Sequence, residues 1–300
     1  MNFEEFLTAV MNDLQERLGD EYRMERKSVR GVNSSIKHSL MLVKSGMNMY
    51  PLVPMEQWYQ YYSFTCKDIG KIAEKICESC KEHIHSGNLD ISRFTQWDSA
   101  KNNIHVKLIN TEKNKELLRE VPHREYLDLS QVYYITLQEA GTGENAVFQV
   151  RNEYMELWGV DESILHDTAW KNMKNDDVIF EKMSDVLNAF VDAGEMEPVD
   201  GIDDTPTYVL GNKSGHNGAV YICNEKILYN ISCILKDDFW LLPSSVHETL
   251  LIPKQCMEDK LWELVWVVSE VNNSELDPEE ILSYHVYCYN RTLRKLVIAG

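Results

Sequence analysis

The segment "PSSVHE", residues 243–248, contains the residue types of a hydrolytic site. Ser244 or Ser245 could act as a nucleophile, with His247 as its base and Glu248 as the acid that orients the imidazole. A nucleophile elbow, however, requires Gly-x-Ser-x-Gly at a turn from a strand into a helix, and this segment has no glycine. The apolar runs on either side are typical of strands. We therefore expect a hairpin turn whose polar groups serve structure or binding, with His247 and Glu248 opening the second strand.

A second group of residues, in "CESCKEHIH", could bind a metal ion. Cys77 and Cys80 provide half of a zinc site, and no second Cys-x-x-Cys pair occurs in the sequence. On one helix these two cysteines are neighbours, whereas His83 and His85 rotate away from them. Because the four groups cannot converge, we expect the cysteines to fill an apolar stripe. No metal and no cofactor are predicted.

The glycine-rich stretch "GNKSGHNGA", residues 211–219, resembles a phosphate-binding loop only in composition. A Walker loop needs Gly-Lys-Ser/Thr at the start of a helix, and here the order differs. The stretch lies between "TYVLG" and "AVYIC", two apolar runs that we interpret as strands. We expect a hairpin loop.

The charge of the chain restricts its partners. With 300 residues, the sequence has 48 acidic and 30 basic side chains, and a formal net charge of -18. Such a chain is repelled by phosphate backbones and by anionic membrane surfaces, so nucleic acid and membranes are not expected as partners. The first residues lack the features of a signal peptide, and seven scattered cysteines are typical of reduced thiols. We expect a cytoplasmic protein.

Periodicity predicts both helices and strands along the first two thirds of the chain. Apolar residues at helical spacing indicate a helix over residues 3–18, and turn residues after position 30 indicate a hairpin. The expected elements are a helix at 3–18, strands at 21–29 and 35–45, an edge strand near 47–55, helices at 55–65 and 66–84, a strand at 104–109, a charged helix at 112–121, extended runs at 126–139 and 145–151, and helices at 152–158 and 161–173, with Asp161 as N-cap of the last.

A change of composition at "VDAGEMEPVDGIDDTP", residues 191–206, predicts a linker, since this acidic stretch has no Lys or Arg. We place a domain boundary there, giving domains at 1–195 and 205–300. After it, pairs of apolar runs alternate with helices at 225–235 and 259–271. This ββα order predicts a mainly antiparallel sheet with helices on one face, so the fold class is α+β.

The helix expected in "DKLWELVWVV" is apolar around most of its circumference, including Trp262 and Trp266. An apolar helix of this kind must be buried, either between the layers of its own domain or at an oligomer interface. We expect the first arrangement.

Several segments resemble a bacterial domain-of-unknown-function family, family 5688. They include "LINTEKNKELLREVPHREYLDLSQVYYI", "NEYMELWGVDESIL", "TYVLGNKSGHNGAVYI", "FWLLPSSVHETLLIP" and "SYHVYCYNR". The resemblance extends from the middle of the chain almost to its end, and the N-terminal opening is similar too. It implies an intracellular bacterial protein, and it implies no particular chemistry.

Two classes of function follow from these residues. The leading hypothesis is a non-enzymatic interaction or regulatory protein with a protein partner. The alternative is a hydrolase or transferase with a polar pocket around Ser244, Ser245, His247 and Glu248. An enzyme requires titratable groups that converge in a concave site, whereas an interaction protein requires a broad exposed patch.

Overall fold

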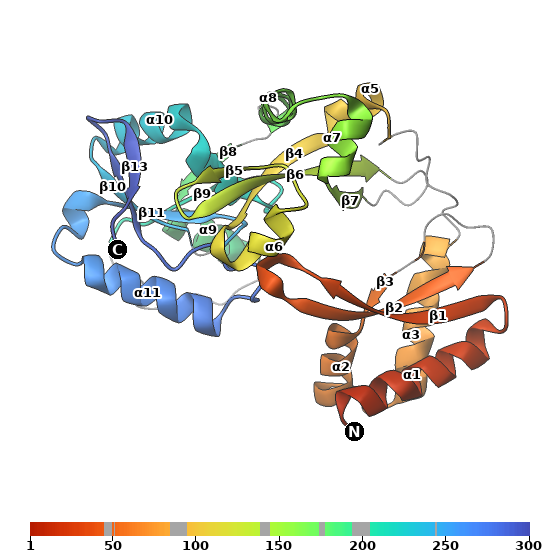
Figure 1. Cartoon of the computed structure of the whole chain (residues 1–300). Helices are drawn as coiled ribbons and strands as arrows, with labels where there is room; N and C mark the ends of the chain where they lie inside the picture. The colour runs from red at the N-terminus through yellow and green to blue at the C-terminus, as the bar shows by residue number, and fades with distance from the viewer. Residues whose placement is uncertain are drawn as a thin grey trace. The chain divides into compact units, whose positions relative to one another are not determined.

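The computed structural model describes residues 1–44, 50, 52–84, 95–138, 145–173, 178–193, 205–243 and 245–300. Contacts between residues divide the chain into two compact units. Unit 1 comprises Met1–Phe94 with Thr136–Val147, and unit 2 comprises Thr95–Ile135 with Phe148–Gly300. Helices accompany antiparallel sheets in the chain, which confirms the predicted α+β class (Figure 1).

In its described residues, unit 1 combines a small sheet with helices (Figure 1). Its strands have the order β1-β2-β3, with β3 at one edge as predicted. The elements are α1 (Phe3–Leu18), β1 (Tyr22–Arg30), η1 (Val32–Ser34), β2 (Ile36–Lys44), β3 (Leu52–Pro54), α2 (Met55–Phe64) and α3 (Ile69–Ile84). The predicted helix at 3–18 and the hairpin after it are confirmed.

The core of unit 1 follows from the helical spacing of apolar residues. Phe6, Val10 and Leu14 of α1 are fully buried and pack in one cluster with residues of β2 and α3. Cys77 and Cys80 belong to the same cluster. Burial raises the pKa of the Cys80 thiol to about 11, so this group stays protonated at neutral pH. Both cysteines therefore behave as small apolar side chains.

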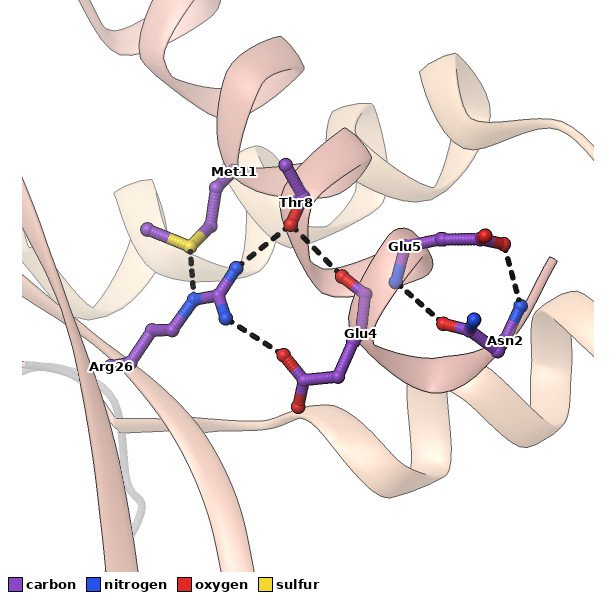
Figure 2. A network of polar contacts seen from close by, with 6 residues as sticks. All are labelled: Asn2, Glu4, Glu5, Thr8, Met11 and Arg26. Atoms are coloured by element: carbon purple, nitrogen blue, oxygen red, sulfur yellow. Dashed lines mark hydrogen bonds and ion pairs between the residues drawn. The ribbon is translucent and has the colours of Figure 1, made fainter.

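Polar contacts attach α1 to β1 (Figure 2). The Arg26 guanidinium donates to Glu4 Oε2 at 3.0 Å, to Thr8 Oγ1 at 2.9 Å and to Met11 Sδ at 3.2 Å. A capping box at the start of α1 pairs Asn2 with Glu5. Because these groups are exposed, the contacts fix the helix against the strand while contributing little stability.

Unit 2 contains a six-stranded sheet with the order β13-β12-β10-β11-β9-β8. The strands are β8 (Val178–Lys182), β9 (Tyr208–Asn212), β10 (Phe239–Leu242), β11 (Thr249–Pro253), β12 (Tyr287–Asn290) and β13 (Lys295–Ile298). The helix α11 (Leu261–Ser274) packs Leu264 and Val268 against Trp240, Leu242 and Ile252 of this sheet. A mainly antiparallel sheet was predicted for this part of the chain, and every neighbouring pair in it is antiparallel.

The opposite face of the same sheet carries α10 (Glu225–Leu235). Phe239, which alternates with Trp240, stacks on Tyr289 with ring centroids 4.9 Å apart. The Tyr229 ring of α10 lies 3.9 Å from the Arg294 guanidinium, beside this stack. Figure 1 shows α10 and α11 on opposite sides of β10. Helices thus lie on both faces of this six-stranded sheet, whereas the sequence pattern predicted helices on one face only.

The predicted strand "AVYIC" is wrong. Residues Gly218–Cys223 form a 3-10 helix, η4, whose residues 219–222 are all buried. Asn217 before it adopts a left-handed conformation, with φ of 56°, which turns the chain out of the strand direction. Because these residues of η4 are all buried, the sequence is continuously apolar here even though it does not form a strand.

The other sheet of the chain has the order β4-β6-β5, with β7 paired to β6. Its strands are β4 (Ile104–Asn110), β5 (His123–Tyr126), β6 (Leu129–Gln138) and β7 (Asn145–Gln149). The helix α8 (Glu162–Met173) packs on β4. Asp161 Oδ1 accepts the Ile164 N–H at 2.8 Å, which confirms the prediction that Asp161 is the N-cap of this helix.

Shorter helices complete the described chain: α5 (Trp97–Ala100), η2 (Lys101–Asn103), η3 (Glu112–Asn114), α6 (Lys115–Leu118), α7 (Asn152–Trp158), α9 (Met183–Asp192) and η5 (Lys254–Cys256). The charged helix predicted at 112–121 is shorter than expected, since η3 and α6 end at Leu118.

The domain boundary predicted between 195 and 205 falls almost entirely outside the described residues. β8 precedes that segment and β9 follows it, yet the two strands pair from Val178↔Asn212 to Lys182↔Tyr208. Both strands belong to unit 2. A division of the chain at this segment stays a prediction.

Candidate functional site

The segment 243–248 connects β10 to β11, whose pairing ends at Leu242↔Leu250. Ser244 lies outside the described residues. Ser245 forms an isolated antiparallel bridge with Ile281, and the Val246 N–H donates to the Glu280 carbonyl at 3.0 Å. β11 begins only at Thr249, so the prediction that His247 and Glu248 open the strand is wrong. Contacts from the 280–281 segment hold these residues in a bend.

Ser245 is buried, and its hydroxyl serves the turn. Ser245 Oγ accepts the backbone N–H of His247 at 3.0 Å. Serine side chains commonly bond to the main chain two residues further on, which supplies a partner for an amide that the turn would leave unpaired. The contact that a Ser–His pair needs, between hydroxyl and ring nitrogen, is not among those of Ser245.

Both ring nitrogens of His247 lie close to another polar group of the chain. Its Nδ1 accepts the backbone N–H of Asn217 at 3.4 Å, which places the ring proton of the neutral form on Nε2. Nε2 lies 3.4 Å from Glu280 Oε1. Glu280 therefore takes the position that the sequence analysis assigned to Glu248, which is exposed and lies beside Gly211. No sequence signal links His247 to a glutamate 33 residues away.

The loop after β9 packs directly on this turn. A Cβ atom at Gly218 would lie 2.6 Å from the His247 carbonyl oxygen and 2.8 Å from Gly211 Cα. The Ala219 N–H donates to the Val246 carbonyl at 3.3 Å. Glycine is required at 218 because backbone atoms meet there, and not to hold a phosphate.

The residues 245–248, 216–218 and 280 thus form one polar cluster in unit 2. His216 lies edge-on to His247, with ring centroids 5.6 Å apart, and Asn217 Nδ2 donates to Tyr134 Oη at 3.5 Å. In the described part of the chain, no three His, Cys, Asp or Glu side chains gather closely enough to hold a metal ion. The side chain of His83 and the whole of His85 lie outside the description.

A different surface of unit 2 was missed by the sequence analysis. The apolar helix α11 buries only one side, through Leu264 and Val268, and exposes Trp262 by 69% and Trp266 by 60%. The expectation that this helix is buried between the layers of its own domain is therefore wrong. Only one face of α11 has the sheet to pack on, and the two tryptophans, four residues apart, share another face.

A groove lies at the first turns of α11. It is lined by Leu261, Trp262, Val265 and Gly300, with Glu258 and Asp259 at its rim. The C-terminus lies beside α11 in Figure 1, in agreement with the presence of Gly300 in this groove. Both rim carboxylates are exposed, and neither forms an ion pair with a described residue. Trp262, Trp266 and the apolar residues of this groove thus form an exposed apolar surface.

The described architecture is that of an α+β protein with antiparallel sheets. A family of unknown function, DUF5688, matches residues 3–291, and the chain belongs to that family. The resemblance noted in the sequence is thereby confirmed. Comparison with curated proteins and with solved structures gives no match. Among the described helices, none has both the length and the apolar character needed to cross a bilayer.

Proposed function

We propose that the protein is a non-enzymatic interaction protein that binds an extended, basic segment of a partner protein at the α11 surface. The exposure of Trp262 and Trp266 carries this proposal. Tryptophan is among the residues most enriched in the energetic centres of interfaces, because burial of its large ring on binding contributes strongly to affinity. Two such rings on one helical face form an anchor for apolar side chains of a partner.

The charge of the groove supports a basic partner. Glu258 and Asp259 stand at its rim without an ion pair among the described residues, and the whole chain has a net charge of -18. A second copy of the chain would place acidic groups against acidic groups, which disfavours self-association through this surface. Lysine or arginine beside apolar anchors would complement both the rim and the tryptophans.

The sheet edge supports an extended partner. β13 is the end strand of the six-stranded sheet, and among the described strands it pairs only with β12. The outer main-chain groups of an end strand can receive an added strand. Gly300, which follows β13, lines the same groove as Trp262, so an added strand would reach the apolar anchor.

Two synthetic peptides test the proposal: one alternates Lys with Leu or Val, and its matched control has Glu in place of every Lys. We expect the Lys peptide to change the tryptophan fluorescence, to bind at least about tenfold more tightly than the Glu peptide, and to weaken with salt. The double variant Trp262→Ala, Trp266→Ala should lose this binding. The matched control is Phe64→Ala, an exposed residue of α2, which should bind like the wild type.

Equal binding of both peptides, or binding of neither at millimolar concentration, would contradict the proposal. A wild-type dimer that the double tryptophan variant converts to monomer would also contradict it, because a second copy would then cover the surface. The hydrolase or transferase alternative receives no support from Ser245, whose hydroxyl accepts a backbone amide.

A further inference from the structure

One face of the β4–β6 pair carries several polar side chains. His105 and Lys107 alternate along β4 with Ile104, Val106 and Leu108, which are fully buried. Tyr134 of β6 stands opposite His105 in the register, and the two rings stack with centroids 5.4 Å apart. His105, Lys107 and Tyr134 are therefore the polar side chains at this part of the β4–β6 pair.

Lys107 has no counter-charge in direct contact. Its side chain is partly buried, and its Nζ lies 5.9 Å from the centroid of the Tyr134 ring. The Lys107 ammonium group makes no hydrogen bond and no ion pair with any described residue. Burial lowers the pKa of Lys107, and the negative charge of Glu279 partly offsets this effect. Partial burial of an ammonium group is unfavourable without a nearby anion, so binding of an anion beside Lys107 would be stabilising.

The neighbours of Lys107 provide further donors. Tyr134 Oη accepts Asn217 Nδ2, which brings the loop after β9 next to the polar face of β4. The carboxylate of Glu280 is occupied by His247 Nε2. Lysine, imidazole and amide groups thus surround the Tyr134 ring, and these are the groups that proteins use to bind carboxylates and phosphates.

We propose that Lys107, together with His105 and Asn217 around the Tyr134 ring, forms a binding site for a small oxyanion, a carboxylate or a phosphate. The oxyanion supplies the counter-charge that Lys107 lacks, and the Tyr134 ring forms an apolar wall beside it. This site is separate from the α11 surface, because it uses residues of β4, β6 and the loop after β9.

The test measures the acylation rate of each lysine by mass spectrometry, using an amine-reactive ester. Sodium acetate and sodium phosphate are the probes, and sodium chloride at equal ionic strength is the reference. We expect one of the two oxyanions, at about 50 mM, to slow the acylation of Lys107 by about fivefold or more. Lys113 is the internal control, because it also lies over a tyrosine ring, that of Tyr284, at 4.9 Å.

A variant gives the second measurement. Phosphate raises the melting temperature of many proteins without binding to a site, so the comparison must be between variants. The oxyanion that protects Lys107 should raise the melting temperature of the wild type and of Lys113→Met more than that of Lys107→Met. Protection by acetate identifies a carboxylate site, and protection by phosphate identifies a phosphate site.

The proposal is overturned if neither oxyanion slows the acylation of Lys107 more than chloride does. It is also overturned if Lys107→Met gains the same thermal stabilisation as the wild type. In either case Lys107 only extends its amine to solvent past an apolar stem. The Trp262→Ala, Trp266→Ala variant should retain the oxyanion effect, which separates this test from that of the proposed partner.

Discussion

The turn at 243–248 and the helix α11 contrast in what they offer to a partner. The turn holds the residue types of a catalytic site, but Ser245 Oγ and both ring nitrogens of His247 already contact other groups of the chain. α11 has no catalytic motif that the sequence analysis identified, yet it presents Trp262 and Trp266 to solvent. The comparison teaches that residue type alone does not decide availability. The contacts already made within the fold decide it.

This contrast predicts different effects of substitutions on the free energy of unfolding and on binding. Residues whose groups are bonded or packed within the fold should affect the free energy of unfolding when they are changed. Residues whose groups are exposed should affect binding and leave stability nearly unchanged. Four changes, ordered from the largest expected effect to the smallest, can break or sharpen the comparison.

Gly218→Ala should destabilise the protein most, by about 3 kcal/mol, because its new Cβ would meet backbone atoms of His247 and Gly211 that cannot move aside. Urea unfolding followed by circular dichroism measures this. Gly211→Ala is the matched control, since its Cβ would find ordinary contacts at 3.6 and 3.8 Å. Equal stability of the two variants would show that the loop after β9 does not pack tightly on the turn.

Leu264→Ala should cost about 2.5 kcal/mol, since this side chain is buried against Trp240 and Leu242. Trp262→Ala, on the exposed face of the same helix, should change the free energy of unfolding by less than about 0.5 kcal/mol. Thermal and urea unfolding of both variants give the comparison. A large loss for Trp262→Ala would mean that its ring is packed within the fold and is not available to a partner.

Ser245→Ala should cost about 1 kcal/mol, the net contribution of one hydrogen bond. In the same preparation, a serine-reactive fluorophosphonate should leave Ser244 and Ser245 unlabelled. Labelling at either serine that is lost in His247→Ala would instead favour the hydrolase or transferase alternative.

Glu280→Gln should have the smallest effect, about 0.5 kcal/mol or less, because both partners of the His247–Glu280 pair are partly exposed. The loss should shrink further at high salt. Unfolding measured at low and at high ionic strength checks this. A loss above about 2 kcal/mol would place the pair in a less polar environment than its exposure indicates.

Local patterns were sufficient to predict many elements of the fold. The apolar residues of α1 recur at helical spacing, and turn residues separate β1 from β2, so both elements were predicted from the sequence. "AVYIC" was misassigned because a short apolar run fits a buried 3-10 helix as well as a strand. The strands β5 and β8 and the helix α9 were also missed.

The candidate site was predicted in part. Its turn between two strands was expected, whereas the pairing of His247 with Glu280 depends on a contact between distant segments. The exposure of α11 was not predictable from composition, since an apolar residue can face either a sheet or a partner. Lys107 carried no sequence signal either, because its burial arises from the elements that β4 meets.

The pairing of β8 with β9 has a consequence for how the protein can be handled. Backbone hydrogen bonds join these strands, so covalent continuity through residues 194–204 is not what keeps β9 in the sheet. Residues 1–193 and 205–300, produced as two polypeptides, would each supply strands to the same six-stranded sheet. The protein is thus suited to fragment complementation, in which two separately produced polypeptides, once mixed, rebuild the sheet through backbone pairing.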